Sequence, residues 1–136
     1  MTDVEFFVTP GYGDAALQRE HYSQAVRIGD RVEIAGQGGW DDAMDFPESL
    51  DEEIARAFGN VSRTLALAGA GWGHVVHVNS YHVGLDIDYE RVNQVMADLF
   101  RRWTPERAPI WTCLGVAALG HPRMRVEVRV TAILPD

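Results

Sequence analysis

The chain has 136 residues, 46% of them hydrophobic, and we expect a single domain over residues 1–136 with a real core. No apolar stretch reaches the roughly 18 residues of a membrane span, the N-terminus does not resemble a signal peptide, and one cysteine allows no internal disulfide, so we expect a cytoplasmic protein without a membrane partner. The net charge of −8, with 12 scattered basic residues, argues against nucleic acid as a partner.

The N-terminal part of the chain predicts three strands. Residues 4–8 have strand composition, and residues 10–13 (Pro-Gly-Tyr-Gly) then predict a turn or loop. Residues 24–28 and 31–35 are two strand-like runs joined by Gly29 and Asp30, which is the pattern of a β-hairpin. Residues 36–40, Gly-Gln-Gly-Gly-Trp, end the third strand and lead into a polar loop.

Two helices follow from apolar spacing. Ser49 with Glu52 has the form of a capping box, and residues 69–73 supply the stop. Between them one apolar stripe consists of Leu50, Ile54, Phe58, Val61 and Leu65. A second helix follows residues 86–88 and ends before Pro105, with helical spacing of Val92, Val95, Met96, Leu99, Phe100 and Trp103.

Three more strands complete the predicted order, at about residues 74–83, 110–118 and 124–134. The order β-β-β-α-β-α-β-β predicts an α+β subunit with a mixed six-stranded sheet and two helices on one face. In the last strand Val126, Val128 and Val130 alternate with polar residues. Because no further layer is left to cover the second face of the sheet, we expect the subunit to form an oligomer.

Several separate motifs resemble one known family, the Rid/YjgF (reactive-intermediate deaminase) proteins. The resemblance extends over roughly residues 20–133, nearly the whole chain, and keeps the order and spacing of that family. Its motifs are Tyr22-Ser23-Gln24-Ala25-Val26, Gly29-Asp30, Gly36-Gln37, Leu65-Ala66-Leu67-Ala68-Gly69, Val92-Asn93, residues 113–119 and Val126-Glu127-Val128.

The resemblance implies a chorismate-mutase-like subunit in a homotrimer, with the sheets lining a central barrel and a ligand cleft between each pair of subunits. It also implies hydrolysis of small enamines and imines, such as 2-aminoacrylate, to a ketoacid and ammonia without a metal or an organic cofactor. In that family an arginine two residues before the Cys113 position holds the substrate carboxylate, since guanidinium offers a matching two-pronged donor.

Here the arginine position is occupied by Trp111. Arg107 lies four residues earlier, about 13 Å along an extended strand, and is too far away to be a simple substitute. We therefore expect that the chain is not a standard 2-aminoacrylate deaminase. Trp111 either shapes the cleft for an aromatic or alicyclic ligand, or it plugs the cleft or extends the subunit interface.

The resemblance places one catalytic residue, Glu127, at the site of the family glutamate that activates water. A partly buried carboxyl group there suits a general acid and base, whereas the alternative is an ion pair with Arg125, Arg129 or an arginine of a neighbouring subunit. The predicted substrate-binding residues are Trp111, Tyr22, Thr112, Cys113, Gly36, Trp40 and Asn93.

The sequence gives little support for two further kinds of site, a nucleophilic cysteine and a metal site. Cys113 has no histidine or aspartate close in sequence that would mark a nucleophile, and small buried cysteines are common. His74, His77 and His82 lie close together without a completing carboxylate or cysteine pattern, so we expect no metal site.

Two hypotheses therefore compete. The first is an enzyme that acts on an imine, an enamine or a related reactive carbonyl compound in the inter-subunit cleft. The second is a non-catalytic ligand-binding or chaperone-like trimer. A ribonuclease activity, which is sometimes attached to this family, fits poorly with the negative charge.

Overall fold

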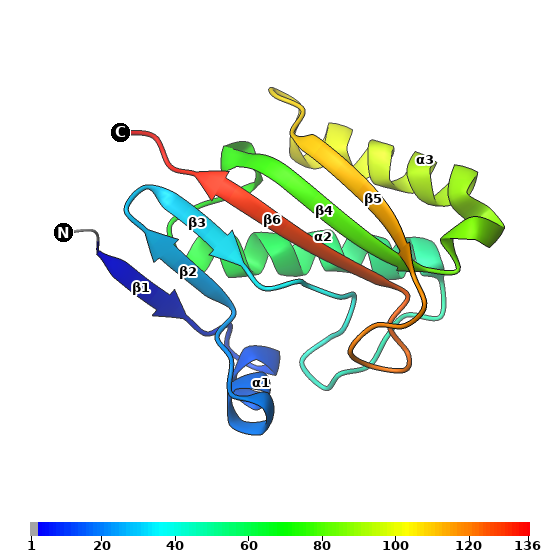
Figure 1. Ribbon diagram of the computed structural model, residues 1–136, viewed down its shortest axis with the longest axis horizontal. Coiled ribbons are helices and arrows are strands. Elements are labelled where there is room, and N and C mark those ends of the chain that lie inside the picture. Colours follow the sequence, from blue (N-terminus) through cyan, green and yellow to red (C-terminus); the bar gives the residue numbers. More distant parts are fainter. Residues whose placement is uncertain (1–2) are drawn as a thin grey trace.

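Six strands form one mixed sheet in the computed structural model, which describes residues 3–136 (Figure 1). The strands are β1 (Val4–Phe7), β2 (Ala25–Ile28), β3 (Arg31–Ile34), β4 (Val75–Val83), β5 (Ile110–Val116) and β6 (Val126–Ile133). Their spatial order is β1-β2-β3-β6-β4-β5. Only β4 and β5 are parallel, because a helix connects them, and the other neighbouring strands are antiparallel. The predicted α+β class with a mixed six-stranded sheet is confirmed.

Two long amphipathic helices, α2 (Leu50–Leu67) and α3 (Leu85–Trp103), cover one face of this sheet. The predicted cap of α2 is present, since the Ser49 hydroxyl accepts a hydrogen bond from the Glu52 amide at 3.3 Å. A short 3-10 helix, η1 (Trp72–His74), precedes β4. Fully buried members of the core between sheet and helices include Ile54, Phe58, Leu65, Met96, Val128 and Val130.

A third helix, α1 (Tyr12–Glu20), shows that the prediction of two helices was wrong for this segment. The Pro-Gly pair at residues 10–11 does form the turn, but the helix begins directly after it. No apolar stripe marks α1, because only Tyr12 and Gly13 are buried. The available signal was composition, since residues 14–20 are mostly strong helix formers.

No helix of residues 3–136 packs over the middle of the second face of the sheet. Charged side chains occupy its middle, where Glu33 pairs with Arg31 and Arg129. Apolar side chains lie toward its edges, and Phe6 on β1 and Ile110 on β5 are 65% and 68% exposed. We call this surface the open face.

Three chain segments meet at one end of the sheet, the lower end in Figure 1. They are α1, the connection of residues 35–49 and the connection of residues 117–125. A second small core of Tyr12, Trp40, Phe46 and Met124 lies beneath them. The ion pair of buried Glu53 with Arg125, 2.7 Å, joins α2 to this end. No helix within residues 3–136 is long and apolar enough to cross a membrane.

Candidate functional site

A pocket of about 330 Å³ opens at the end of the sheet where these three segments meet. Its walls come from α1, from residues 22–24 and 35–44, from the 120–124 turn and from β6. The pocket contains four of the predicted site residues, which are Tyr22, Gly36, Trp40 and Glu127.

Glu127 lies on β6 between the buried residues Val126 and Val128, so its side chain points to the open face. It lies directly over Gly36: a Cβ atom at that glycine would be 1.9 Å from the Glu127 Oε1 atom. The absence of a side chain at Gly36 therefore gives the carboxyl group its place in the pocket wall.

Neither of the two neighbouring arginines neutralises Glu127 within the subunit. Arg125 is bound to Glu53 at 2.7 Å, and Arg129 lies 3.5 Å from Glu33. Burial raises the pKa of Glu127 above its ordinary value, because the charged form loses hydration that no partner among residues 3–136 replaces. A carboxyl group with a raised pKa is suited to both accept and donate a proton.

Tyr22 and Gln24 lie beside this carboxyl group. Burial raises the pKa of the Tyr22 hydroxyl, and the negative charges of Glu20 and Glu127 raise it further. The nearby side-chain amide of Gln24 lowers the pKa of this hydroxyl and so partly opposes the shift. Tyr22 therefore remains protonated near neutral pH and is available as a hydrogen-bond donor.

A buried polar chain supports the inner wall of the pocket. The Tyr12 hydroxyl donates to Gln37 Oε1 at 2.7 Å, and Gln37 Nε2 donates to Gln24 Oε1 at 2.8 Å. Trp40 packs edge-on against Tyr12 with ring centroids 5.5 Å apart. Two donors in this wall, Gln24 Nε2 and Trp40 Nε1, are buried without a hydrogen-bond partner among the described residues.

The other predicted residues lie elsewhere, on β5 and α3. Trp111 pairs in register with Val78, which is in the core, so its indole faces the helices. It packs edge-on against Phe100 with centroids 5.2 Å apart and donates a hydrogen bond to Ser80 Oγ at 2.9 Å. Within one subunit the sheet therefore separates Trp111 from Glu127.

Cys113 shares the helix side of β5 with Trp111, whereas Thr112 is exposed on the open face. The Cys113 thiol lies 3.6 Å from Asn93 Oδ1 on α3. Burial raises the pKa of this thiol, and a hydrogen bond with Ser80 partly opposes the shift. A raised pKa disfavours the thiolate, which is the reactive form.

The sequence interpretation did not identify several residues of the pocket wall. They include Tyr12, Arg19, Gln24, Met44, His121 and Met124. Tyr12 and Arg19 were missed together with α1, whereas the others are isolated residues in connections or at a strand edge and carry no local signal. No group of three His, Cys, Asp or Glu side chains that could hold a metal ion occurs in the described part of the chain.

Comparison with known proteins shows the family. The family model described as Endoribonuclease L-PSP matches residues 13–134. Because this match includes nearly the entire chain, the protein belongs to that family, the Rid/YjgF family.

Two similar proteins support this assignment. The RutC family protein YjgH of Escherichia coli is 31% identical over 126 residues, which are 91% of this chain and 92% of that protein. The 2-iminobutanoate/2-iminopropanoate deaminase of Mus musculus is 32% identical over 115 residues, 82% of this chain and 80% of that protein.

Solved structures have the same fold. A structure of protein YJGH has a TM-score of 0.80 and 27% identity, with 96% of this chain and 95% of that chain covered. A protein from Entamoeba histolytica has a TM-score of 0.79 and 27% identity, with 97% and 100% covered.

Proposed function

We propose that this protein hydrolyses an imine, an enamine or a related reactive carbonyl compound in the pocket beside Glu127. The observation that carries the proposal is the Glu127 carboxyl group, which lies over Gly36 without an ion-pair partner in the described subunit and has a raised pKa. Similar proteins named as imine deaminases support the same reaction class.

Hydrolysis of an imine needs two proton transfers at neighbouring atoms. Glu127 takes a proton from water as the water oxygen bonds to the imine carbon, and it then gives that proton to the nitrogen. In the resulting carbinolamine Glu127 takes the hydroxyl proton and passes it to the nitrogen as the C–N bond breaks, so a carbonyl compound and ammonia leave and the carboxylate is regenerated. An enamine first takes up a proton at carbon and then follows the same path. These steps use the chain's own groups and no cofactor.

The substrate we propose is not the small 2-aminoacrylate. The Trp111 N–H donates to Ser80, and its ring packs on Phe100, so this residue does not offer the two-pronged donor of an arginine. Aromatic walls at Tyr12, Tyr22 and Trp40 favour a bulkier substrate.

We further propose a cytoplasmic homotrimer in which the open faces line a central barrel and neighbouring subunits complete the cleft. The exposed apolar side chains of the open face support this assembly. In it, the Trp111, Thr112, Cys113 and Asn93 group of one subunit would approach the Glu127 pocket of the next. The net charge of −8 argues against RNA as the substrate.

Competition against semicarbazide trapping tests the proposed reaction. The imine of phenylalanine is generated by an amino-acid oxidase, 2-aminoacrylate is generated by a dehydratase, and ketoacid and ammonia release are followed. We expect faster hydrolysis of the bulky imine. Glu127→Gln should reduce the rate about 100-fold or more. Gly36→Ala should do the same by displacing the carboxyl group, whereas Gly59→Ala, with open space around its Cβ position, should remain active.

Two outcomes contradict the proposal in different ways. Strong wild-type turnover of 2-aminoacrylate would show that the interpretation of Trp111 is wrong. Ligand stabilisation that persists in Glu127→Ala, without product from any imine, would instead support the non-catalytic binding trimer.

A further inference from the structure

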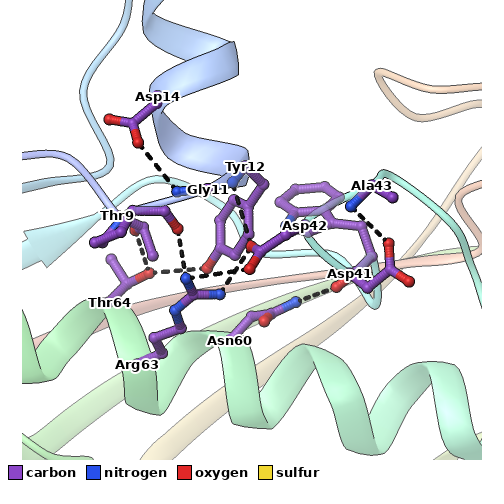
Figure 2. A network of polar contacts seen from close by, with 12 residues as sticks. Thr9, Gly11, Tyr12, Asp14, Asp41, Asp42, Ala43, Asn60, Arg63 and Thr64 are labelled. Atoms are coloured by element: carbon purple, nitrogen blue, oxygen red, sulfur yellow. Dashed lines mark hydrogen bonds and ion pairs between the residues drawn. The ribbon is translucent and has the colours of Figure 1, made fainter.

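Helix α1 is held against the pocket mainly by polar contacts at its N-terminal end (Figure 2). The Arg63 guanidinium reaches from α2 to Asp42 Oδ1 at 2.9 Å and to the Pro10 carbonyl, and it lies 5.2 Å from the centre of the Tyr12 ring. Asp42 Oδ1 also accepts the Tyr12 amide at 3.3 Å. Because only Tyr12 and Gly13 of α1 are buried, these polar contacts contribute much of what holds the helix beside the pocket.

The last turn of α1 brings Arg19 to the pocket wall. Every other arginine of the chain makes an ion pair, a hydrogen bond to a backbone carbonyl or a contact with an aromatic ring. These arginines are Arg27, Arg31, Arg56, Arg63, Arg91, Arg101, Arg102, Arg107, Arg123, Arg125 and Arg129. Within residues 3–136 Arg19 has no such contact, not even with Glu20 beside it.

A second observation in the same pocket points to an acceptor-rich ligand group. Gln24 is 1% exposed and Trp40 is 6% exposed, yet the N–H groups at Gln24 Nε2 and Trp40 Nε1 have no partner in the described chain. Buried donors normally find an acceptor, and both residues line this pocket with Arg19. A carboxylate supplies several acceptor lone pairs together with the charge that a guanidinium attracts.

We propose that Arg19 is the carboxylate-binding residue of this site, and that the substrates are carboxylate-bearing imines or enamines with an aromatic or bulky apolar side chain. The guanidinium that binds the carboxylate thus comes from α1. On β5, Trp111 occupies the position at which the family has its arginine. Tyr12, Trp40, Met44 and Met124 provide an apolar wall for the side chain of the substrate. This inference rests on the proposed function for the identity of the reacting group.

Calorimetry with two stable probes tests the anchor without turnover. Phenylacetate and phenylacetamide have nearly the same shape and differ in charge. We expect the wild-type protein to bind phenylacetate about ten-fold or more tightly than phenylacetamide. Arg19→Gln should remove this preference, and Arg19→Lys should restore part of it. Arg101→Gln, which removes the same charge from an exposed position on α3, should keep it.

The outcomes separate this inference from the proposed reaction. If the Arg19→Gln variant still prefers phenylacetate, Arg19 is not the carboxylate-binding residue, whether or not imines are hydrolysed. Loss of the preference in Arg19→Gln together with a raised KM for the imine of phenylalanine and an unchanged kcat supports it. If no imine is hydrolysed but the preference depends on Arg19, the role of Arg19 in carboxylate binding is supported and the proposed hydrolysis is wrong.

Discussion

His82 is buried and Glu127 is half-buried, and their pKa values are shifted in opposite directions from the ordinary values. His82 faces the core from β4, and its Nε2 atom bonds to Ser80 Oγ at 2.8 Å. Its Nδ1 atom is buried without a partner in the described residues. Burial lowers the pKa of His82 from 6.5 to about 4, because the charged ring would lose its hydration.

The pKa of His82 predicts acid sensitivity. Below pH 6.5 the unfolded chain takes up a proton that the folded chain resists until about pH 4. The free energy of unfolding should therefore fall by about 2 to 3 kcal/mol over this window. Urea denaturation at pH 7, 5.5 and 4 should show a smaller fall for His82→Gln than for the wild type. His77→Gln, a half-buried neighbour, is the control, and an equal fall in all three proteins would refute the prediction.

Glu127 predicts the opposite pH dependence, because burial raises its pKa. A raised carboxyl pKa favours the folded state at low pH, and this contribution is lost as the pH rises through the folded-state pKa. Glu127→Gln should thus have a higher Tm than the wild type at pH 8, and the difference should vanish near pH 4. The exposed Glu5→Gln variant is the control. A lower Tm at pH 8 would mean that the carboxylate has a favourable partner, such as an arginine of a neighbouring subunit.

At the scale of elements, most helices and strands follow local rules. The Ser49 cap, the apolar stripe of α2 and the hairpin around Gly29 all lie where the sequence predicts them. Gly29 has a φ of 63°, which favours glycine at this turn. Helix α1 does not follow from such local rules, because Asp42 and Arg63 stabilise its N-terminal end and lie 30 and 53 residues away from their partners Tyr12 and Pro10.

The Arg63 contacts predict that α1 is loosened by a single substitution. Arg63→Gln should lower the free energy of unfolding by about 1 kcal/mol, since exposed ion pairs and cation–π contacts are individually weak. Amide exchange over residues 12–20, measured by mass spectrometry, should rise about five-fold, which is the factor that corresponds to this free energy in a local opening equilibrium. The control is Arg56→Gln on the same helix, whose only documented bond, to the Asp45 carbonyl, is long at 3.5 Å. Unchanged exchange in Arg63→Gln would show that the cluster does not hold α1.

At the scale of the whole molecule, the open face is notable because apolar side chains remain exposed on it in a single subunit. Its apolar edges include Phe6 and Leu114, which are 65% and 42% exposed. Burial of such side chains between copies would stabilise an assembly by about 25 cal/mol per Å² of apolar surface. The charged centre, with Glu33 between Arg31 and Arg129, is already satisfied within the subunit.

Light scattering should give three times the subunit mass of 15.2 kDa for the wild-type protein. Phe6→Glu or Leu114→Glu should reduce the mass toward that of one subunit, because a carboxylate would have to be buried. Ile87→Glu is the matched control: Ile87 is 85% exposed in the first turn of α3, away from the open face. A wild-type mass equal to one subunit would contradict the proposed trimer.

The sequence by itself determined the sheet class, the family and the type of every element except α1 and the short η1, because caps, turns and apolar periods act over a few residues. It also identified Glu127 and Gly36, which the structure brings together in one wall. Tertiary structure decided which face each strand residue occupies. Trp111 and Glu127 lie on opposite faces because the pairing of β5 with β4, and of β4 with β6, fixes the register. The tertiary structure also decided that Arg19 lies at the pocket, because the side chains that hold α1 in place are distant from it in sequence.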